Sequence, residues 1–229
     1  TKWNPFFRTA GSIGTTIGER LRRLSPYPID LHQVHQPMGF SSVEAEMQAM
    51  AALVEAKKIG AVGVSNFNES RMRRAHAALQ RLGRPLASNQ VRYSLLHRKI
   101  ERNGVLKAAK ELGITIIAYS PLEQGVLTGR FHDDPGSVQR LQGPRKFRHA
   151  FRHLGQSRPL VDELRAVARA HDASPAQVAL AWMTQFHGDT VVVIPGATSA
   201  RQIADSVGSQ QFVLSRAELD AIDERAREF

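Results

Sequence analysis

The sequence alternates short runs rich in β-branched residues with longer segments of helical periodicity, and this alternation constrains the fold most. The runs GITIIAYS and DTVVVIP are almost continuously apolar, which is typical of parallel strands covered on both faces. Strands are predicted at residues 1–3, 29–35, 61–65, 88–91, 114–119 and 191–194. Helices are predicted at residues 12–24, 43–58, 69–82, 100–112, 159–171, 175–186 and 199–207. This order predicts a parallel sheet with helices packed on it.

Several predicted helices begin with residues that cap helix N-termini. The candidate caps are Ser41 or Ser42, Ser174 and Ser215. Pro175 follows one of them, at a position that favours proline in the first helical turn. Glu218 completes the pattern S-x-x-E of a capping box. The residues next to each helix start are therefore enough to predict where these helices begin.

Two α/β architectures fit this alternation, and motif content favours one of them. An open doubly wound sheet normally carries a glycine-rich phosphate loop, and the sequence has neither G-x-G-x-x-G nor a Walker A lysine motif. A closed eight-stranded barrel usually takes about 250 residues, and the 229 residues here provide six βα units. We therefore predict a (β/α)8 TIM barrel that lacks two of its units, as one partial domain over residues 1–229.

Composition narrows the range of functions and locations. The sequence has no cysteine, which excludes disulfides and thiolate metal ligands and is typical of a reducing compartment. No apolar run approaches the roughly 18 residues that span a bilayer, so we expect a cytoplasmic protein without a membrane partner. The net charge of +10 would suit nucleic acid, a membrane surface or an anionic small molecule. Part of it lies in residues 130–153, expected to be a solvated basic loop or helix. Without aromatic interleaving or a known module, we expect no nucleic acid as a partner.

Polar residues stand at the ends of the predicted strands, where a barrel of this type has its active site. They are Lys2 with Trp3, His35, Ser65 with Asn66, Asn89 with Gln90, and Tyr119 with Ser120. No pair of histidines forms H-E-x-x-H, and there is no G-x-S-x-G elbow. The sequence thus predicts a polar site without a metal ion or a serine nucleophile.

Six motifs in series resemble those of the aldo-keto reductases. They are TKW, IDLHQVHQP, GAVGVSNF, SNQVRYSLLHR, LGITIIAYSPLEQGVLTGRF and VVVIPGATSARQ, in the order of that family and along essentially the whole chain. The resemblance implies a (β/α)8 barrel that binds NADPH in extended form. It also implies the reduction of an aldehyde or ketone to an alcohol by hydride transfer.

The resemblance implies catalytic roles for two residues. Lys2 matches a lysine at the end of the third strand of the family, and an ammonium there lowers the pKa of a neighbouring phenol by favouring its anion. His35 matches the histidine that hydrogen-bonds the substrate carbonyl and orients it for hydride attack; taken alone, outside its motif, a histidine here would more often be a satisfied residue of the barrel rim. Trp3 is expected to line the substrate pocket, with a place in the core as the alternative.

The same resemblance implies a site for NADPH. Positions that hold the nicotinamide are Ser65, Asn66 and Gln90 for its carboxamide and Tyr119 for stacking on its ring. Positions that wrap the pyrophosphate are Ser120, Leu122, Gly125 and Arg130, the last in place of the usual lysine. Positions around the 2′-phosphoribose and the adenine are Gly196, Thr198, Gln202, Asp205 and Ser206. Asp205–Ser206 stands where the family commonly has Glu-Asn.

The aspartate and tyrosine of the family's active site belong to its first two βα units, which the sequence lacks. Tyr27 precedes a strand at its N-terminal end, Tyr93 follows the fourth strand, and Tyr119 is needed for stacking. Because the sequence starts at Thr1 without methionine, we expect an upstream tyrosine in a longer product to act as the general acid. The alternative is a truncated or non-catalytic NADPH-binding barrel that serves as a regulatory or partner module.

Overall fold

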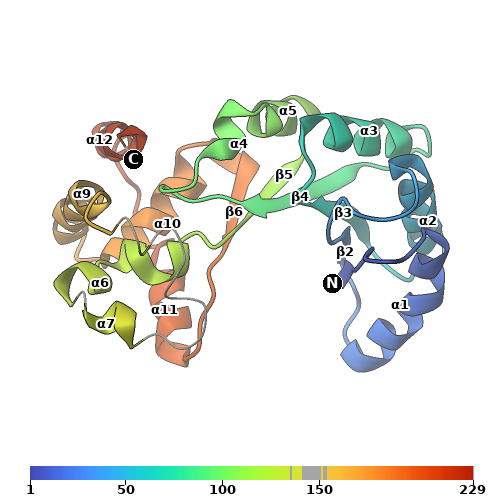
Figure 1. Ribbon diagram of the computed structural model, residues 1–229, viewed down its shortest axis with the longest axis horizontal. Coiled ribbons are helices and arrows are strands. Elements are labelled where there is room, and N and C mark those ends of the chain that lie inside the picture. The colour runs from blue at the N-terminus through green and yellow to red at the C-terminus, as the bar shows by residue number, and fades with distance from the viewer. Residues whose placement is uncertain (135, 141–150, 152–153, 229) are drawn as a thin grey trace. The chain divides into compact units, whose positions relative to one another are not determined.

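The computed structural model describes residues 1–134, 136–140, 151 and 154–228 (Figure 1). Its six strands are β1 (Lys2–Trp3), β2 (Leu31–Val34), β3 (Ala61–Ser65), β4 (Leu86–Arg92), β5 (Thr115–Tyr119) and β6 (Val191–Ile194). They lie in one sheet in the order of the sequence, and β1 to β4 pair in parallel. Sequential parallel strands separated by helices are the arrangement of a TIM-type barrel, here with six strands in the described residues.

Helices follow the strands along the chain (Figure 1). The first group is α1 (Gly11–Leu24), α2 (Val43–Glu55), α3 (Glu69–Gln80), α4 (Lys99–Arg102) and α5 (Val105–Leu112). The second is η1 (Glu123–Thr128), α6 (Arg130–Asp133), α7 (Gly136–Gln139), α9 (Arg158–Ala170), α10 (Pro175–Gln185), η3 (Gly188–Thr190), α11 (Ala200–Gly208) and α12 (Arg216–Arg227). Most of the basic segment, residues 141–150 and 152–153, lies outside the described residues.

The chain divides into two compact units. Unit 1 consists of Thr1–Val91 and Lys99–Ile117, and unit 2 consists of Arg92–Arg98 and Ala118–Phe229. The single domain predicted for residues 1–229 stays a prediction.

Unit 1 is built on the parallel strands β1 to β4. Its core contains the methionines of α2 and α3 and the side chains of Trp3 and Phe67, all buried. Gly63 of β3 faces Gln33 and Ser88 of the neighbouring strands, and a Cβ atom there would overlap the Ser88 hydroxyl. Gln33 Nε2 donates to Ser88 Oγ at 3.1 Å, so these buried polar groups are satisfied across three strands.

Unit 2 is held by buried ionic contacts as well as by an apolar helix. Seven of the eleven residues of α10 are buried, and α10 packs on α9. Arg98 pairs with Asp223 of α12 at 2.5 Å, and its guanidinium lies 5.1 Å from the ring centroid of Trp182. The last helix is thus fixed to the segment that begins unit 2.

The predicted helix caps are confirmed, with one choice resolved. Ser42 is the N-cap of α2, and its hydroxyl accepts from the Ala45 N–H. Ser41 instead accepts a hydrogen bond from the Ala10 N–H at 2.8 Å. Ser174 and Ser215 both form complete capping boxes, at the starts of α10 and α12.

Several predicted boundaries are wrong, among them the following three. The helix predicted over residues 100–112 is two helices, because Gly104 has a left-handed φ of 83°. The helix predicted over 43–58 ends at Glu55, since Lys57 has a φ of 54°. The strand predicted over 29–35 spans only Leu31–Val34, so His35 lies one residue beyond the strand rather than at its last position.

Candidate functional site

The first part of the site lies at the carboxyl ends of β1 and β2. The His35 N–H donates to the Trp3 carbonyl at 2.9 Å, so the pairing of these strands continues as far as His35. Burial lowers the pKa of Lys2, and burial together with the charge of Lys2 lowers the pKa of His35. His35 is therefore neutral at neutral pH and can donate from one ring nitrogen. Within the described part of the chain, neither side chain has a hydrogen bond or an ion pair.

The loops that follow these two residues are joined to each other. We call residues 4–10 and residues 36–41 the loop pair. The Phe40 N–H donates to the Arg8 carbonyl at 3.1 Å, in addition to the contact between Ala10 and Ser41. Arg71 of α3 donates to the Pro37 carbonyl at 2.6 Å. The two loops that follow Lys2 and His35 are thus hydrogen-bonded to each other, and one of them is also bonded to α3.

Three predicted nicotinamide positions meet at the ends of β3 and β4. Ser65 is in register with Gln90, and its hydroxyl donates to the Gln90 carbonyl at 2.9 Å. The Asn66 N–H donates to the same carbonyl, and the Asn66 amide donates to the Ser65 hydroxyl at 3.2 Å. Asn66 has a φ of 59°, which an asparagine tolerates at a turn that leaves a strand. These bonds fix the backbone at the ends of β3 and β4 and hold the side chains of Ser65 and Asn66 in contact with each other.

The side-chain amide of Gln90 fits a ligand of the same chemistry. Gln90 is 7% exposed, and among the described residues its side-chain amide has no hydrogen-bond partner. A carboxamide ligand has one acceptor and paired donors, which such an amide can complement. The residues present therefore fit the predicted nicotinamide group.

Two neighbouring polar residues have structural positions. Asn89, one of the polar residues at the ends of the predicted strands, is buried and donates to the Phe67 carbonyl at 2.9 Å. Trp3 is fully buried, and its indole N–H donates to Ser12 Oγ at 2.9 Å. This is the core position that was the alternative for Trp3, and its place in the pocket wall stays a prediction.

In unit 2, the predicted pyrophosphate positions form a compact turn after β5. Tyr119 is half-buried, and Ser120 adopts a φ of 55° directly after it. The Gly125 N–H donates to the Leu122 carbonyl at 2.9 Å, and Gly125 has a φ of 96° that glycine adopts without strain. Glycine and local hydrogen bonds therefore set the conformation of this turn.

The sequence analysis missed the residue that anchors this turn. Glu123 is buried and accepts from Arg92 at 2.6 Å and from the Ser94 hydroxyl at 2.8 Å. It lies between two apolar-rich segments, where an acidic residue has no counter-ion nearby in the sequence. Its partners come from about 30 residues earlier in the chain, so no local pattern signals them.

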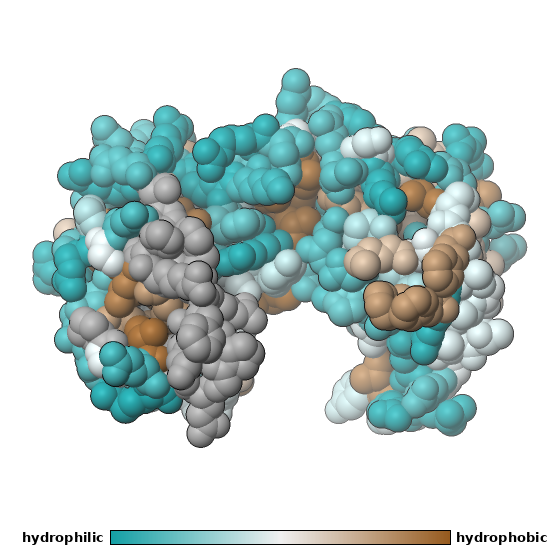
Figure 2. All heavy atoms as spheres, viewed as in Figure 1, coloured by the Kyte–Doolittle hydropathy of each residue, from teal (hydrophilic) through white to brown (hydrophobic). Residues whose placement is uncertain are grey.

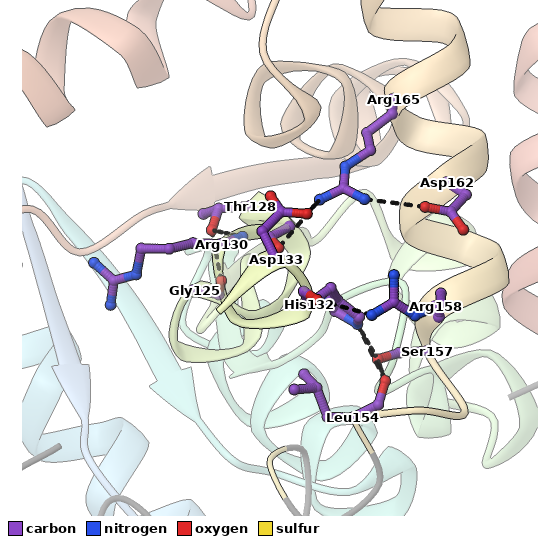
Figure 3. Close-up of polar contacts among 11 residues, drawn as sticks. Gly125, Thr128, Arg130, His132, Asp133, Leu154, Ser157, Arg158, Asp162 and Arg165 are labelled. Carbon is purple, nitrogen blue, oxygen red and sulfur yellow. Dashed lines mark hydrogen bonds and ion pairs between the residues drawn. The ribbon is translucent and has the colours of Figure 1, made fainter. Parts of the chain in front are cut away.

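Arg130 is exposed at the surface of this region (Figure 3). Its guanidinium lies 4.6 Å from the ring centroid of Phe131, and its N–H donates to Thr128 Oγ1. Figure 3 shows its side chain directed away from Asp133, which is paired with Arg165 at 2.5 Å. Among the described residues Arg130 makes no ion pair, so its charge can serve an anionic ligand.

The predicted phosphoribose and adenine positions lie at and within α11. Gly196 is exposed in the loop before the helix. Gln202 Oε1 accepts from the N–H of Thr198 at 2.7 Å and from its hydroxyl, and the Gln202 carbonyl accepts from Ser206 Oγ. Asp205 accepts from the Ser174 hydroxyl at 3.1 Å. Gln202 and Asp205 therefore already stabilise the helix start and a neighbouring cap.

The three tyrosines differ in environment. Tyr27 is exposed in the segment before β2. Tyr93 is buried, and its hydroxyl lies 2.5 Å from His187 Nε2. Tyr119 ends β5. Among the described residues, no group of three or more potential ligands could hold a metal ion, and no helix is long and apolar enough to cross a membrane.

Comparisons with known proteins agree with this geometry. The profile described as "Aldo/keto reductase family" matches residues 1–227. An uncharacterized oxidoreductase of Mycobacterium tuberculosis is 42% identical over 210 residues, which make up 91% of this chain and 62% of that protein. An aldo-keto reductase of Schizosaccharomyces pombe, whose name includes NADP(+), is 34% identical over 89% of this chain and 59% of its own length. The chain thus spans about three fifths of the length of these relatives.

A solved structure shares the fold. It is the crystal structure of a thermostable aldo-keto reductase in complex with the inhibitor epalrestat. The TM-score is 0.76 at 25% identity, over 98% of this chain and 69% of that one. The predicted fold class, a TIM-type barrel lacking some units, is confirmed.

Proposed function

Because this chain belongs to the aldo/keto reductase family, we propose that it reduces an aldehyde or ketone to an alcohol with NADPH. The observation that carries the proposal is the placement of Lys2 and His35 at the ends of paired strands, with side chains that make no bond within the described residues. Family membership supports an oxidoreductase in general, and the particular cofactor and substrate are our proposal.

The residues of unit 1 have complementary tasks. His35, kept neutral by burial and by Lys2, donates a hydrogen bond to the substrate carbonyl oxygen and so fixes the carbonyl carbon for attack. The ammonium of Lys2 stabilises negative charge that develops on that oxygen and on an adjacent acid. NADPH, when bound, supplies the hydride. The oxygen also takes up a proton, a role that the family resemblance assigns to a tyrosine of two βα units that this sequence does not contain.

The residues that the family resemblance assigns to the cofactor each fit one of its groups by their own chemistry. Ser65, Asn66 and Gln90 would bind the carboxamide, and Tyr119 would cover the nicotinamide ring. The cation of Arg130 would bind a phosphate group. Preference for NADPH is supported by this cation and by the NADP(+) in the name of the yeast relative.

Exposed aromatic side chains support a flat, apolar carbonyl as the substrate. Phe6, Phe7 and Phe40 of the loop pair are 55%, 75% and 69% exposed, and the rings of Phe7 and Phe40 lie 6.1 Å apart. Figure 2 shows hydrophobic residues as brown areas among hydrophilic ones on the face in view. Because these residues follow Lys2 and His35 directly, we assign them to substrate binding. We propose neither nucleic acid nor a membrane as a partner.

The test is NADPH oxidation by the purified full-length protein with short aliphatic aldehydes, aromatic aldehydes and steroid ketones. We expect aromatic aldehydes to be reduced best, and His35→Gln and Lys2→Met each to lower kcat/KM by about a hundredfold or more. NADPH affinity, measured by fluorescence, should stay within about twofold of wild type. His76→Gln and Lys58→Met, on α3 and after α2, are matched controls. Unchanged rates in the His35 variant would contradict the proposed role.

A second function, NADPH binding without turnover, is favoured by one observation. Unit 1, which contains Lys2 and His35, has Tyr27 as its one tyrosine, and Tyr27 is exposed in the segment before β2. The same assay separates the two functions. Tight NADPH binding with no aldehyde-dependent oxidation would identify a cofactor-sensing module.

A further inference from the structure

A buried carboxyl group lies beneath the loop that follows His35. Glu46 belongs to the first turn of α2 and is only 3% exposed. A Cβ atom built on Gly39 would overlap Glu46 Oε1 and approach Pro5 Cβ to 3.3 Å. The carboxyl group of Glu46 therefore packs directly against the backbone of the loop pair at Gly39.

This contact reaches both halves of the loop pair. Pro5 belongs to the loop after Lys2, and Gly39 belongs to the loop after His35. One residue further on, Phe40 is bonded to Arg8 of the other loop. A displacement at Gly39 is therefore transmitted to the segments that follow both candidate catalytic residues.

The carboxyl group has no bonded counter-ion. Among the described residues, no hydrogen bond or ion pair is made to the Glu46 side chain. Arg71 is the cation that acts on it electrostatically, but its guanidinium donates to the Pro37 carbonyl at 2.6 Å. Glu44, on the same helical turn, is occupied by Arg74 at 2.9 Å. The guanidinium of Arg71 thus acts both on the Glu46 carboxyl group and on the Pro37 carbonyl of the loop pair.

Burial raises the pKa of Glu46 to about 7, against the opposing effect of Arg71. Of the other charged residues on α3, Arg73 is paired with Glu69 and Glu111, and Arg74 is paired with Glu44. In α1 the charged residues lie within residues 19–23, and β3 has none. The carboxyl group of Glu46 therefore changes between its protonated and its charged form within the neutral range of pH.

We propose that Glu46 is a positioning residue whose protonated form supports the loop pair and thereby holds His35 in place. Loss of the proton to solvent leaves a buried carboxylate, which attracts Arg71 away from the Pro37 carbonyl. The loop of residues 36–41 then loses its bond to α3. Where it concerns His35, this inference rests on the proposed function.

Hydrogen–deuterium exchange of the peptide containing residues 36–41 tests the inference without any need for turnover. The full-length protein is compared at about pH 6 and about pH 8.5, with rates corrected for intrinsic exchange. We expect the corrected exchange to be roughly tenfold faster at the higher pH in wild type. Glu46→Gln should show slow exchange at both values, and the matched control Glu44→Gln should behave like wild type.

If the Glu46→Gln variant fails to fold, a second measurement, made on the wild-type protein, still tests the inference. Carbon-13 NMR of the glutamate side chains in wild type should show one carboxyl group that titrates near neutral pH. The inference is overturned if no such group titrates there, or if wild-type exchange in residues 36–41 is independent of pH. It is also overturned if Glu46→Gln keeps the wild-type dependence.

Activity separates this inference from the proposed function. In an active enzyme, kcat/KM should fall above about pH 7 in wild type and in Glu44→Gln, and this fall should be lost in Glu46→Gln. Absence of reductase activity together with Glu46-dependent exchange would refute the proposed function and keep the loop support. Activity without Glu46-dependent exchange would refute the loop support alone.

Discussion

Two buried titratable groups in unit 1 have pKa values shifted in opposite directions. Burial raises the pKa of Glu46 from 4.5 to about 7 and lowers the pKa of His32 from 6.5 to about 4. Between about pH 4.5 and 6.5 the folded state keeps the proton of Glu46 that the unfolded state has lost, so this group lowers the free energy of unfolding as pH rises. Over the same interval the unfolded state binds a proton at His32 that the folded state excludes, so this group raises it. The two effects oppose each other.

We expect single substitutions to separate the two opposing contributions to the pH dependence of the free energy of unfolding. Relative to wild type, the free energy of unfolding of His32→Gln should fall with rising pH, by at most about 1.4 kcal/mol per pH unit between about pH 4.5 and 6.5. Glu46→Gln should show a rise of similar size, and the double variant should run parallel to wild type. Urea unfolding at a series of pH values measures all four. A His32→Gln profile parallel to wild type would contradict the assignment.

At the residue scale, the sequence identified groups that recur in motifs and missed groups that act alone. Lys2 and His35 stand inside recognisable motifs, and the structure brings them to neighbouring strand ends. Glu46 was missed, although it lies three residues after Val43 and one before Met47 on the buried face of α2. An acid at an apolar position of a helical pattern is a usable signal. Glu123 offers no such signal, because its partners are distant in sequence.

At the element scale, Gly104 interrupts a helix that the sequence pattern would continue. It has a φ of 83°, and a Cβ atom there would overlap the carboxylate of Glu69. Gly83 has a φ of 67° but open space around it. The two glycines therefore differ in steric surroundings while sharing a left-handed backbone.

We expect Gly83→Ala to lower the free energy of unfolding by about 1 kcal/mol, the cost of a left-handed alanine. Gly104→Ala should cost more, about 2 kcal/mol or above, because Glu69 must also move. Denaturant unfolding measures both. Adding Glu69→Ala should remove part of the excess from Gly104→Ala only. Equal losses in the two single variants would show that Glu69 gives way freely.

Helix starts were more predictable than helix ends and short helices. The serine caps act on N–H groups two or three residues away, so their effect is local and visible in sequence. The turn from Glu123 to Thr128 depends on left-handed φ values at Gln124 and Gly125 and on a distant arginine. No periodicity announces such a segment.

At the scale of the whole molecule, unit 2 is closed by an ion pair across 125 residues of sequence. Arg98 and Asp223 are both 7% exposed, and Asp223 also pairs with Arg227 at 2.7 Å, so removal of the Asp223 charge takes a carboxylate away from a buried guanidinium. Asp220, three residues earlier on α12, forms an exposed pair with Arg216. The helix thus carries a buried and an exposed ion pair side by side.

We expect Asp223→Asn to lower the free energy of unfolding by about 3 kcal/mol and to speed hydrogen exchange in α12. Asp220→Asn, the matched control, should cost less than about 1 kcal/mol, since exposed pairs contribute little. Denaturant unfolding and hydrogen exchange together measure the two effects. A loss for Asp223→Asn no larger than for Asp220→Asn would show that packing of α12 suffices without the charge.

The order of the strands was predictable, whereas the division into two units was not. Each strand is a local apolar run, and sequential parallel pairing follows from the βα alternation. The division depends on contacts such as that between Arg98 and Asp223, for which the sequence contains no local signal. Long-range pairing is what a reading along the chain misses.

The joined loops also bear on how such a protein can be altered. Phe40 is bonded to Arg8, Ser41 to Ala10, and Gly39 lies against Pro5, so neither loop has a conformation of its own. A protein engineer who exchanges one loop for that of a homologue would break the contacts of the other. The two segments should therefore be exchanged together. Variant libraries that change both segments at once should yield more folded proteins than libraries that change either segment alone.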